Sequence, residues 1–257
     1  MAMFLVPAVC ISSAETCTPP AEVRSKLQNK PTPAALNELG VWYAGQQQYS
    51  CAVEAFAISL QMDSTQPDLP HIVFMFGASL YLSGDVKEGI DSLREAERLG
   101  YRDIKLHLVL AAALDSTHET ADAEKEWREV LALDPETTNA LDSLSSDLTS
   151  DGDFAATIAL LESPRLLPQR TPAQSLNLAS AYAKTGKLEE AVHVLLDALN
   201  TTPDSIDIAG NLAQFLAQFN RRNEAVAVLK LEMECHPNDP QLKQNLDGIQ
   251  ASAAAHK

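Results

Sequence analysis

The histidines and cysteines are the side chains of this sequence that most readily bind metals or take part in catalysis. None of the six histidines lies three or four residues from another histidine or from a cysteine, the spacing that places two metal ligands on one helix face. Cys235 and His236 are adjacent, so on a helix they point in different directions. His71 and His107 hold similar places in neighbouring segments, and an enzymatic site near them is one hypothesis. The alternative is that both are ordinary surface histidines.

Sequence motifs of the common enzyme classes are absent. The chain contains no glycine-rich phosphate-binding loop, no nucleophile elbow and no zinc-protease motif. The acidic pair Glu189 and Glu190 falls in the first turn of an expected helix, where carboxylates interact favourably with the helix dipole. The sequence therefore predicts no catalytic residue, no cofactor and no metal site, and it favours a protein that is not an enzyme.

The charge of the chain narrows the kinds of partner. Its 35 Asp and Glu residues and 19 Lys and Arg residues give a net charge of −16. Nucleic acids and anionic membranes attract basic surfaces, so we expect neither as a partner. The acidic surface either keeps the chain soluble or steers a basic partner towards it.

One segment, Pro172 to Ser205, shows the elements that must position any site. Thr171 can cap a helix that starts at Pro172, a residue favoured at the first helical position. Gly186 ends that helix, because glycine adopts a positive φ at little cost. A second apolar stripe follows, and Pro203 stops it because proline cannot continue the hydrogen-bond ladder.

The same pattern recurs every 34 residues. Small residues hold the eighth and twentieth positions of each frame, where two helices can approach closely. The eighth positions are Gly40, Gly77, Ala111, Ser145, Ala179 and Ala213, and the twentieth are Ala52, Gly89, Ala123, Thr157, Ala191 and Ala225. The fifteenth position is the turn, held by Gln47, Gly84, His118, Gly152, Gly186 and Asn220. Glycine, asparagine and histidine tolerate the left-handed conformation, and Gln47 fits least well.

This pattern resembles the tetratricopeptide repeat, a helix–turn–helix unit of the same length. The resemblance covers roughly Pro33 to Lys257. It is carried in the first repeat by Leu39, Gly40, Tyr43, Ala52 and Phe56, and in the fifth by Leu178, Tyr182, Ala191 and Pro203. It implies an all-α fold, a right-handed α-solenoid of six tetratricopeptide repeats with a C-terminal capping helix. The repeats span 33–66, 70–103, 104–137, 138–171, 172–205 and 206–239, and residues 240–257 form the capping helix and tail.

Two departures from the repeat are informative. Tyr101 stands where the second repeat should close with a proline. Pro164 lies inside the second helix of the fourth repeat and should end it near Ser163.

The first 14 residues have features of a signal peptide. The run from Met3 to Ile11 is apolar but too short to span a bilayer, and Ser12 and Ala14 are the small residues expected before a cleavage site. Against this interpretation, no Lys or Arg precedes the run and Pro7 interrupts it. We expect a secreted or periplasmic protein with no transmembrane segment; the alternative is an apolar tail on a cytoplasmic protein. Residues 15–32 are expected to form a linker with a short helix.

The four cysteines are too few for a disulfide framework. A lipoprotein site at Cys10 is disfavoured because Val9 is not a small residue. In an exported chain Cys17 and Cys51 could pair, and a buried free thiol at Cys51 is the alternative. No CxxC motif is present, so metal or thioredoxin-like chemistry has no support.

The resemblance also implies a concave groove lined by the first helix of each repeat. The groove contacts that it predicts are His71, Phe74, Tyr81, Lys105, Leu108, Asn177 and Asn211. The groove should be apolar near Phe74, Tyr81 and Leu108 and more polar further on. The alternative is that Phe74 and Tyr81 only pack against neighbouring helices. The full clamp with which some members of the family bind a chain-end carboxylate is absent, so we do not expect that specificity.

The sequence thus favours a non-catalytic protein–protein interaction module that binds a protein or peptide in the groove. The alternative is a scaffold or assembly subunit of a bacterial envelope or secretion machine, whose repeats hold larger partners through their convex face and edges.

Overall fold

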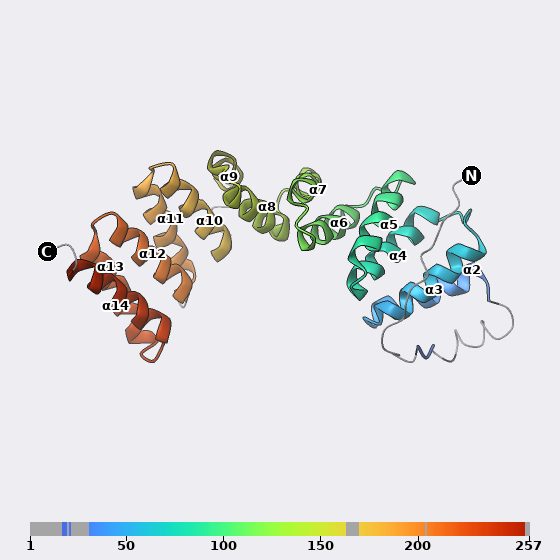
Figure 1. The fold of residues 1–257 in the computed structure, drawn as a ribbon, viewed down its shortest axis with the longest axis horizontal. Coiled ribbons are helices and arrows are strands. Elements are labelled where there is room, and N and C mark those ends of the chain that lie inside the picture. The colour runs from blue at the N-terminus through green and yellow to red at the C-terminus, as the bar shows by residue number, and fades with distance from the viewer. Residues whose placement is uncertain (1–16, 20, 22–30, 163–169, 204, 255–257) are drawn as a thin grey trace. The chain divides into compact units, whose positions relative to one another are not determined.

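The structure is a computed structural model that describes residues 17–19, 21, 31–162, 170–203 and 205–254. Every regular element in these ranges is an α-helix (Figure 1), and none of the described residues forms a strand. The chain divides between Leu133 and Asp134 into two compact units, unit 1 (Met1–Leu133) and unit 2 (Asp134–Lys257). Each unit is described by itself.

The described residues of unit 1 form three antiparallel helix pairs. They are α2 (Pro33–Gly45) with α3 (Tyr49–Met62), α4 (Leu69–Ser83) with α5 (Val86–Arg98), and α6 (Ile104–Ser116) with α7 (Thr120–Leu133). The second helix of each pair also packs against the first helix of the next pair, and α4 contacts both α2 and α6. The first helices of the three pairs therefore lie side by side, and they form one surface.

Within unit 2, the residues that the structure describes form three further pairs and a last helix. They are α8 (Thr138–Ser150) with α9 (Phe154–Leu161), α10 (Pro172–Lys184) with α11 (Leu188–Thr201), and α12 (Ile206–Gln218) with α13 (Arg222–Cys235). Helix α14 (Pro240–Ala254) packs against both α12 and α13. The predicted fold class, an all-α array of six helix–turn–helix repeats with a C-terminal capping helix, is confirmed.

The turn residue of every pair adopts the conformation that the frame predicts. The six turn positions have φ between 59° and 101°, which is the left-handed region. Glycine accepts this φ freely, but Gln47 at 59° does not, because its Cβ crowds the backbone there. The packing of the two helices therefore sets the turn geometry, and the turn residue adopts a positive φ even where its type disfavours it.

The small residues of the frame lie where helices meet most closely. A Cβ placed on Gly40 would lie 2.7 Å from the ring of Phe56, and one on Gly89 would lie 2.8 Å from the backbone nitrogen of Tyr81. Real Cβ contacts are longer than this, so these two positions require glycine. Between the helices, leucines and Phe56 are fully buried and supply most of the core.

Helix α9 is shorter than its counterparts, as Pro164 predicts. It has eight residues and ends at Leu161, two residues before the predicted end at Ser163. Arg170 closes the helix end, because its Nε donates a hydrogen bond of 3.0 Å to the Leu161 carbonyl oxygen. Glu162 follows the helix and accepts a hydrogen bond from the hydroxyl of Tyr182. Burial, together with this hydrogen bond, raises the pKa of Tyr182 to about 12.

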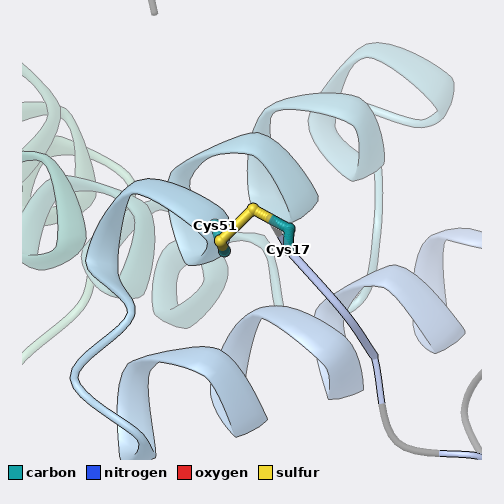
Figure 2. Close-up of a disulfide and its surroundings, with 2 residues drawn as sticks. All are labelled: Cys17 and Cys51. Atoms are coloured by element: carbon teal, nitrogen blue, oxygen red, sulfur yellow. A yellow bond between two sulfur atoms is a disulfide. The ribbon is translucent and has the colours of Figure 1, made fainter. Parts of the chain in front are cut away.

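A disulfide joins Cys17 to Cys51 in helix α3, with the two Cα atoms 5.6 Å apart (Figure 2). Cys51 is only 1% exposed. The pairing that the sequence left open is therefore present, and Cys51 is not a free thiol. Cys235, at the end of α13, is free and exposed.

The predicted signal segment 1–14 and most of the predicted linker 15–32 lie outside the described residues. Among the residues that the structure does describe, no helix combines the length and the apolar character needed to cross a membrane.

Candidate functional site

The surface of unit 1 formed by α4 and α6 carries the best-defined candidate site. The hydroxyl of Tyr81 on α4 donates a hydrogen bond of 3.4 Å to the carbonyl oxygen of Ala112 on α6. Leu82, the residue after Tyr81, is 50% exposed, and Leu108, one turn before Ala112, is half-buried. We call this surface the α4–α6 face, defined by Ala78, Tyr81, Leu82, Leu108, Ala112 and Asp115. These residues recur at helical spacing, which places them on one side of each helix.

A carboxylate stands at one end of this face. Asp115 lies one turn after Ala112, and its Oδ2 accepts a hydrogen bond of 2.8 Å from Nε1 of Trp127 on α7. Trp127 is buried, so the indole holds the carboxylate in one orientation. Burial raises the pKa of Asp115, and the hydrogen bond from Trp127 acts in the opposite direction.

Lys105 stands at the other end of α6. Its side chain is exposed, and its backbone nitrogen donates to the carboxylate of Asp103, which caps the helix. Ten residues separate Lys105 from Asp115, and at a rise of 1.5 Å per residue their Cα atoms are about 15 Å apart along the helix. The α4–α6 face is therefore apolar in the middle, with a cation at one end and an anion at the other.

Phe74 contributes to the core more than to the surface. It is 5% exposed, and its ring is stacked on that of Tyr101 with the centroids 4.6 Å apart. His71 lies beside the same stack, 5.7 Å from Tyr101, and its Nδ1 is 3.2 Å from the carboxylate of Asp68. Tyr101, which replaces the usual closing proline, thus covers Phe74. Little of the Phe74 ring is left for a ligand, and the packing alternative describes this residue better than the groove prediction does.

The two predicted contacts in unit 2 are engaged within the protein. Asn177 on α10 donates a hydrogen bond of 3.0 Å from Nδ2 to the hydroxyl of Ser145 on α8. Asn211 on α12 donates one of 2.8 Å from Nδ2 to the carbonyl oxygen of Asp207. Asp142 Oδ1 likewise accepts from Thr171 and Gln174. The bonds of Asn177 and Asp142 join neighbouring repeats, whereas the bond of Asn211 lies within α12.

His71 and His107 have different partners and do not form a common site. His71 is paired with Asp68, whereas Nδ1 of His107 lies 2.7 Å from a carboxylate oxygen of Glu126 on α7. The side chains of His107 and Glu126 are 11% and 8% exposed, so this pair is a polar contact inside the third helix pair. No group of three or more His, Cys, Asp or Glu side chains in the described part of the chain is arranged to hold a metal ion.

Known proteins share this architecture. A family model described as the tetratricopeptide repeat matches residues 176–202, which lie in α10 and α11. The TPR repeat-containing protein YpiA of Bacillus subtilis (strain 168) is 24% identical over 180 residues, which are 70% of this chain. Those residues are 43% of YpiA, so the match extends over less than half of that relative. The helix pairs of this chain have the tetratricopeptide-repeat fold, and residues 176–202 match the repeat itself.

Solved structures of tetratricopeptide-repeat proteins have the same fold. One from Parabacteroides merdae ATCC 43184 has a TM-score of 0.65 at 14% identity and covers 86% of this chain and 87% of its own. YrrB, described as a TPR protein with an unusual peptide-binding site, has a TM-score of 0.59 at 17% identity. That match covers 73% of this chain and 95% of YrrB. At these identities the likeness shows the fold alone.

Tyr101 had no place in the predicted set of contacts, and Asp115 was predicted only as a groove-facing position of the third frame. Asp115 holds the twelfth position of the third frame, equivalent to Tyr81 in the second, and that equivalence was the available signal. For Tyr101, the only signal in the sequence was that it replaces the proline expected at the end of the second repeat. Neither residue's partner can be seen from its spacing, because Trp127 and Phe74 reach them from other helices.

Proposed function

We propose that this protein is a non-catalytic interaction module that binds a segment of another polypeptide on the α4–α6 face of unit 1. The observation that carries the proposal is the apolar surface formed by the exposed Leu82 and the partly exposed Tyr81 and Leu108. The helices that carry these residues, α4 and α6, are held in place by their packing against α5 and α7. A rigid aromatic residue beside exposed aliphatic side chains is a typical centre of a protein interface. The peptide-binding site of YrrB, a protein of the same fold, agrees with this use of the architecture.

Tyr81→Ala should weaken peptide binding at least tenfold, because central tyrosines in interfaces contribute about 2 kcal/mol or more. Ligands would be selected from a random 12-residue peptide library displayed on phage, and their affinity for both proteins measured by fluorescence anisotropy. Circular dichroism would show that the variant retains its helices.

Met62→Ala is the control, because Met62 is an exposed apolar residue on α3, outside the α4–α6 face. Peptides that bind the Tyr81 variant as well as the original chain would contradict the proposal. If binding were instead lost with Met62→Ala, the scaffold alternative would gain support, since α3 is the second helix of its pair.

We further propose that the protein is exported to the periplasm or secreted, with cleavage after Ala14. The disulfide supports this, because such bonds persist in oxidising compartments and are rare in the cytosol. Cleavage there would keep Cys17 in the mature chain.

Protein recovered from the periplasm or the medium should begin at Glu15. Its intact mass should rise by two hydrogens on reduction, since Cys17 and Cys51 are the pair that opens. Mass spectrometry of each cell fraction measures both quantities. Recovery of an uncleaved chain with reactive thiols at Cys17 and Cys51 from the cytoplasm would rule out export.

A further inference from the structure

The carboxylate of Asp115 is positioned to meet a ligand on the α4–α6 face. The carbonyl oxygen of Ala112, one turn earlier on α6, accepts a hydrogen bond from the hydroxyl of Tyr81 on α4. The end of the Tyr81 side chain therefore lies one turn of α6 away from Asp115. Asp115 is partly exposed, and the bond from Trp127 uses only one of its oxygens. A carboxylate accepts about four hydrogen bonds. In the part of the chain that the structure describes, no other side chain or backbone group donates a hydrogen bond to the Asp115 carboxylate.

The surroundings of Asp115 favour a positive charge. Helix α6 ends at Ser116, so the negative end of the helix dipole lies beside the carboxylate. Lys105, the cation on the same helix, is about 15 Å away, which exceeds the Debye length of about 8 Å at physiological salt. The chain as a whole carries a net charge of −16, which favours the approach of basic partners.

The neighbouring side chains fit the rest of a basic residue. The ring of Tyr81 offers an aromatic face for a cation. Leu82 and Ala112 offer apolar surface, against which the methylene stem of a lysine or arginine can pack. A carboxylate, an aromatic ring and aliphatic carbon thus meet within one turn of two neighbouring helices.

We propose that Asp115 and Tyr81 form a subsite for a lysine or arginine side chain of the bound polypeptide. This inference rests on the proposed function of the α4–α6 face and names the chemistry of its ligand. The ammonium or guanidinium group bonds to the open oxygen of Asp115, and its stem lies along Tyr81 and Leu82.

Asp115→Asn tests the subsite with little disturbance to the fold, because the amide oxygen can still accept from Trp127. Random 12-residue peptides displayed on phage would be selected separately on the original chain and on the variant. Lysine or arginine should be enriched at one position with the original chain, and this enrichment should disappear with Asp115→Asn.

A double-mutant cycle measures the contact directly. Replacing the selected lysine or arginine by methionine should weaken binding to the original chain about tenfold, which corresponds to one charge-assisted hydrogen bond of about 1.5 kcal/mol. The same peptide change should have little effect on binding to Asp115→Asn. Asp91→Asn, which removes an exposed carboxylate from α5, is the matched control and should leave the preference intact.

The outcomes separate the subsite from the proposed function. Peptides that depend on Tyr81 but show no enrichment in basic residues would overturn the subsite and leave the binding face standing. A preference for basic residues that survives in Asp115→Asn would also overturn it, by assigning the effect to net charge. If no selected peptide depends on Tyr81, both proposals fail.

Discussion

Reduction of the Cys17–Cys51 disulfide should lower the free energy of unfolding of unit 1 by about 2–4 kcal/mol. The bond closes a loop across a sequence separation of 34, and opening it restores conformational freedom to the unfolded chain. Cys51 is 1% exposed in the folded protein, so the sulfur that reduction frees lies in a buried position. Hydrogen exchange of the backbone amides in α3, measured with and without reductant, reports the loss of stability in the helix that contains Cys51. Exchange should be faster with reductant.

Local exchange is the suitable measurement because an array of repeats need not unfold in a single step. Cys17→Ser should reproduce the effect of reductant, whereas Cys235→Ser should have none, since Cys235 is free and exposed. Identical exchange in α3 for the oxidised and reduced chains would show that the disulfide does not stabilise this end of unit 1.

Glu126→Ala should lower the free energy of unfolding by about 2–4 kcal/mol, between the cost of an unpaired buried polar group and that of an unpaired buried charge. The carboxylate of Glu126 and Nδ1 of His107 are 2.7 Å apart, and both side chains are almost closed off from water. Removing the acceptor leaves the imidazole in this environment without its partner. Urea unfolding followed by circular dichroism, together with hydrogen exchange in α6 and α7, measures the loss.

The double variant with His107→Leu and Glu126→Leu provides the sharper comparison. An apolar pair of similar volume should recover most of the stability, because replacing both partners of a buried pair is often neutral. Glu129→Ala, on the exposed side of the same helix, should change the free energy little. If Glu126→Ala behaves like Glu129→Ala, the buried pair does not contribute to stability.

The helix pairs could be predicted because their determinants are local. A small residue at a close approach, a residue that accepts positive φ at the turn, and a proline that stops a helix each act within a few residues. Gln47 shows the strength of this reasoning, since its position in the frame predicted a turn that its own preference opposes. Pro164 likewise predicted the short helix α9.

The pairings between helices could not be predicted in the same way. Glu126 resembles a surface residue in the sequence, and only the packing of α6 on α7 brings it to His107. Phe74 has the spacing of a groove residue, but Tyr101 covers it from the end of α5. The division between Leu133 and Asp134 is also hidden, because the 34-residue period continues across it without a break.

The disulfide also determines how the protein would respond to a mechanical pull. A force applied to the chain before Cys17 passes through the sulfur–sulfur bond directly into α3. Helix α2 and the turn that follows it lie inside the closed loop, so they carry none of this load. At about 3.5 Å per extended residue, reduction followed by unfolding of α2 would release roughly 120 Å of chain length to the same force. The segment between the two cysteines, which includes α2, is therefore extra length that becomes available only when the bond is reduced.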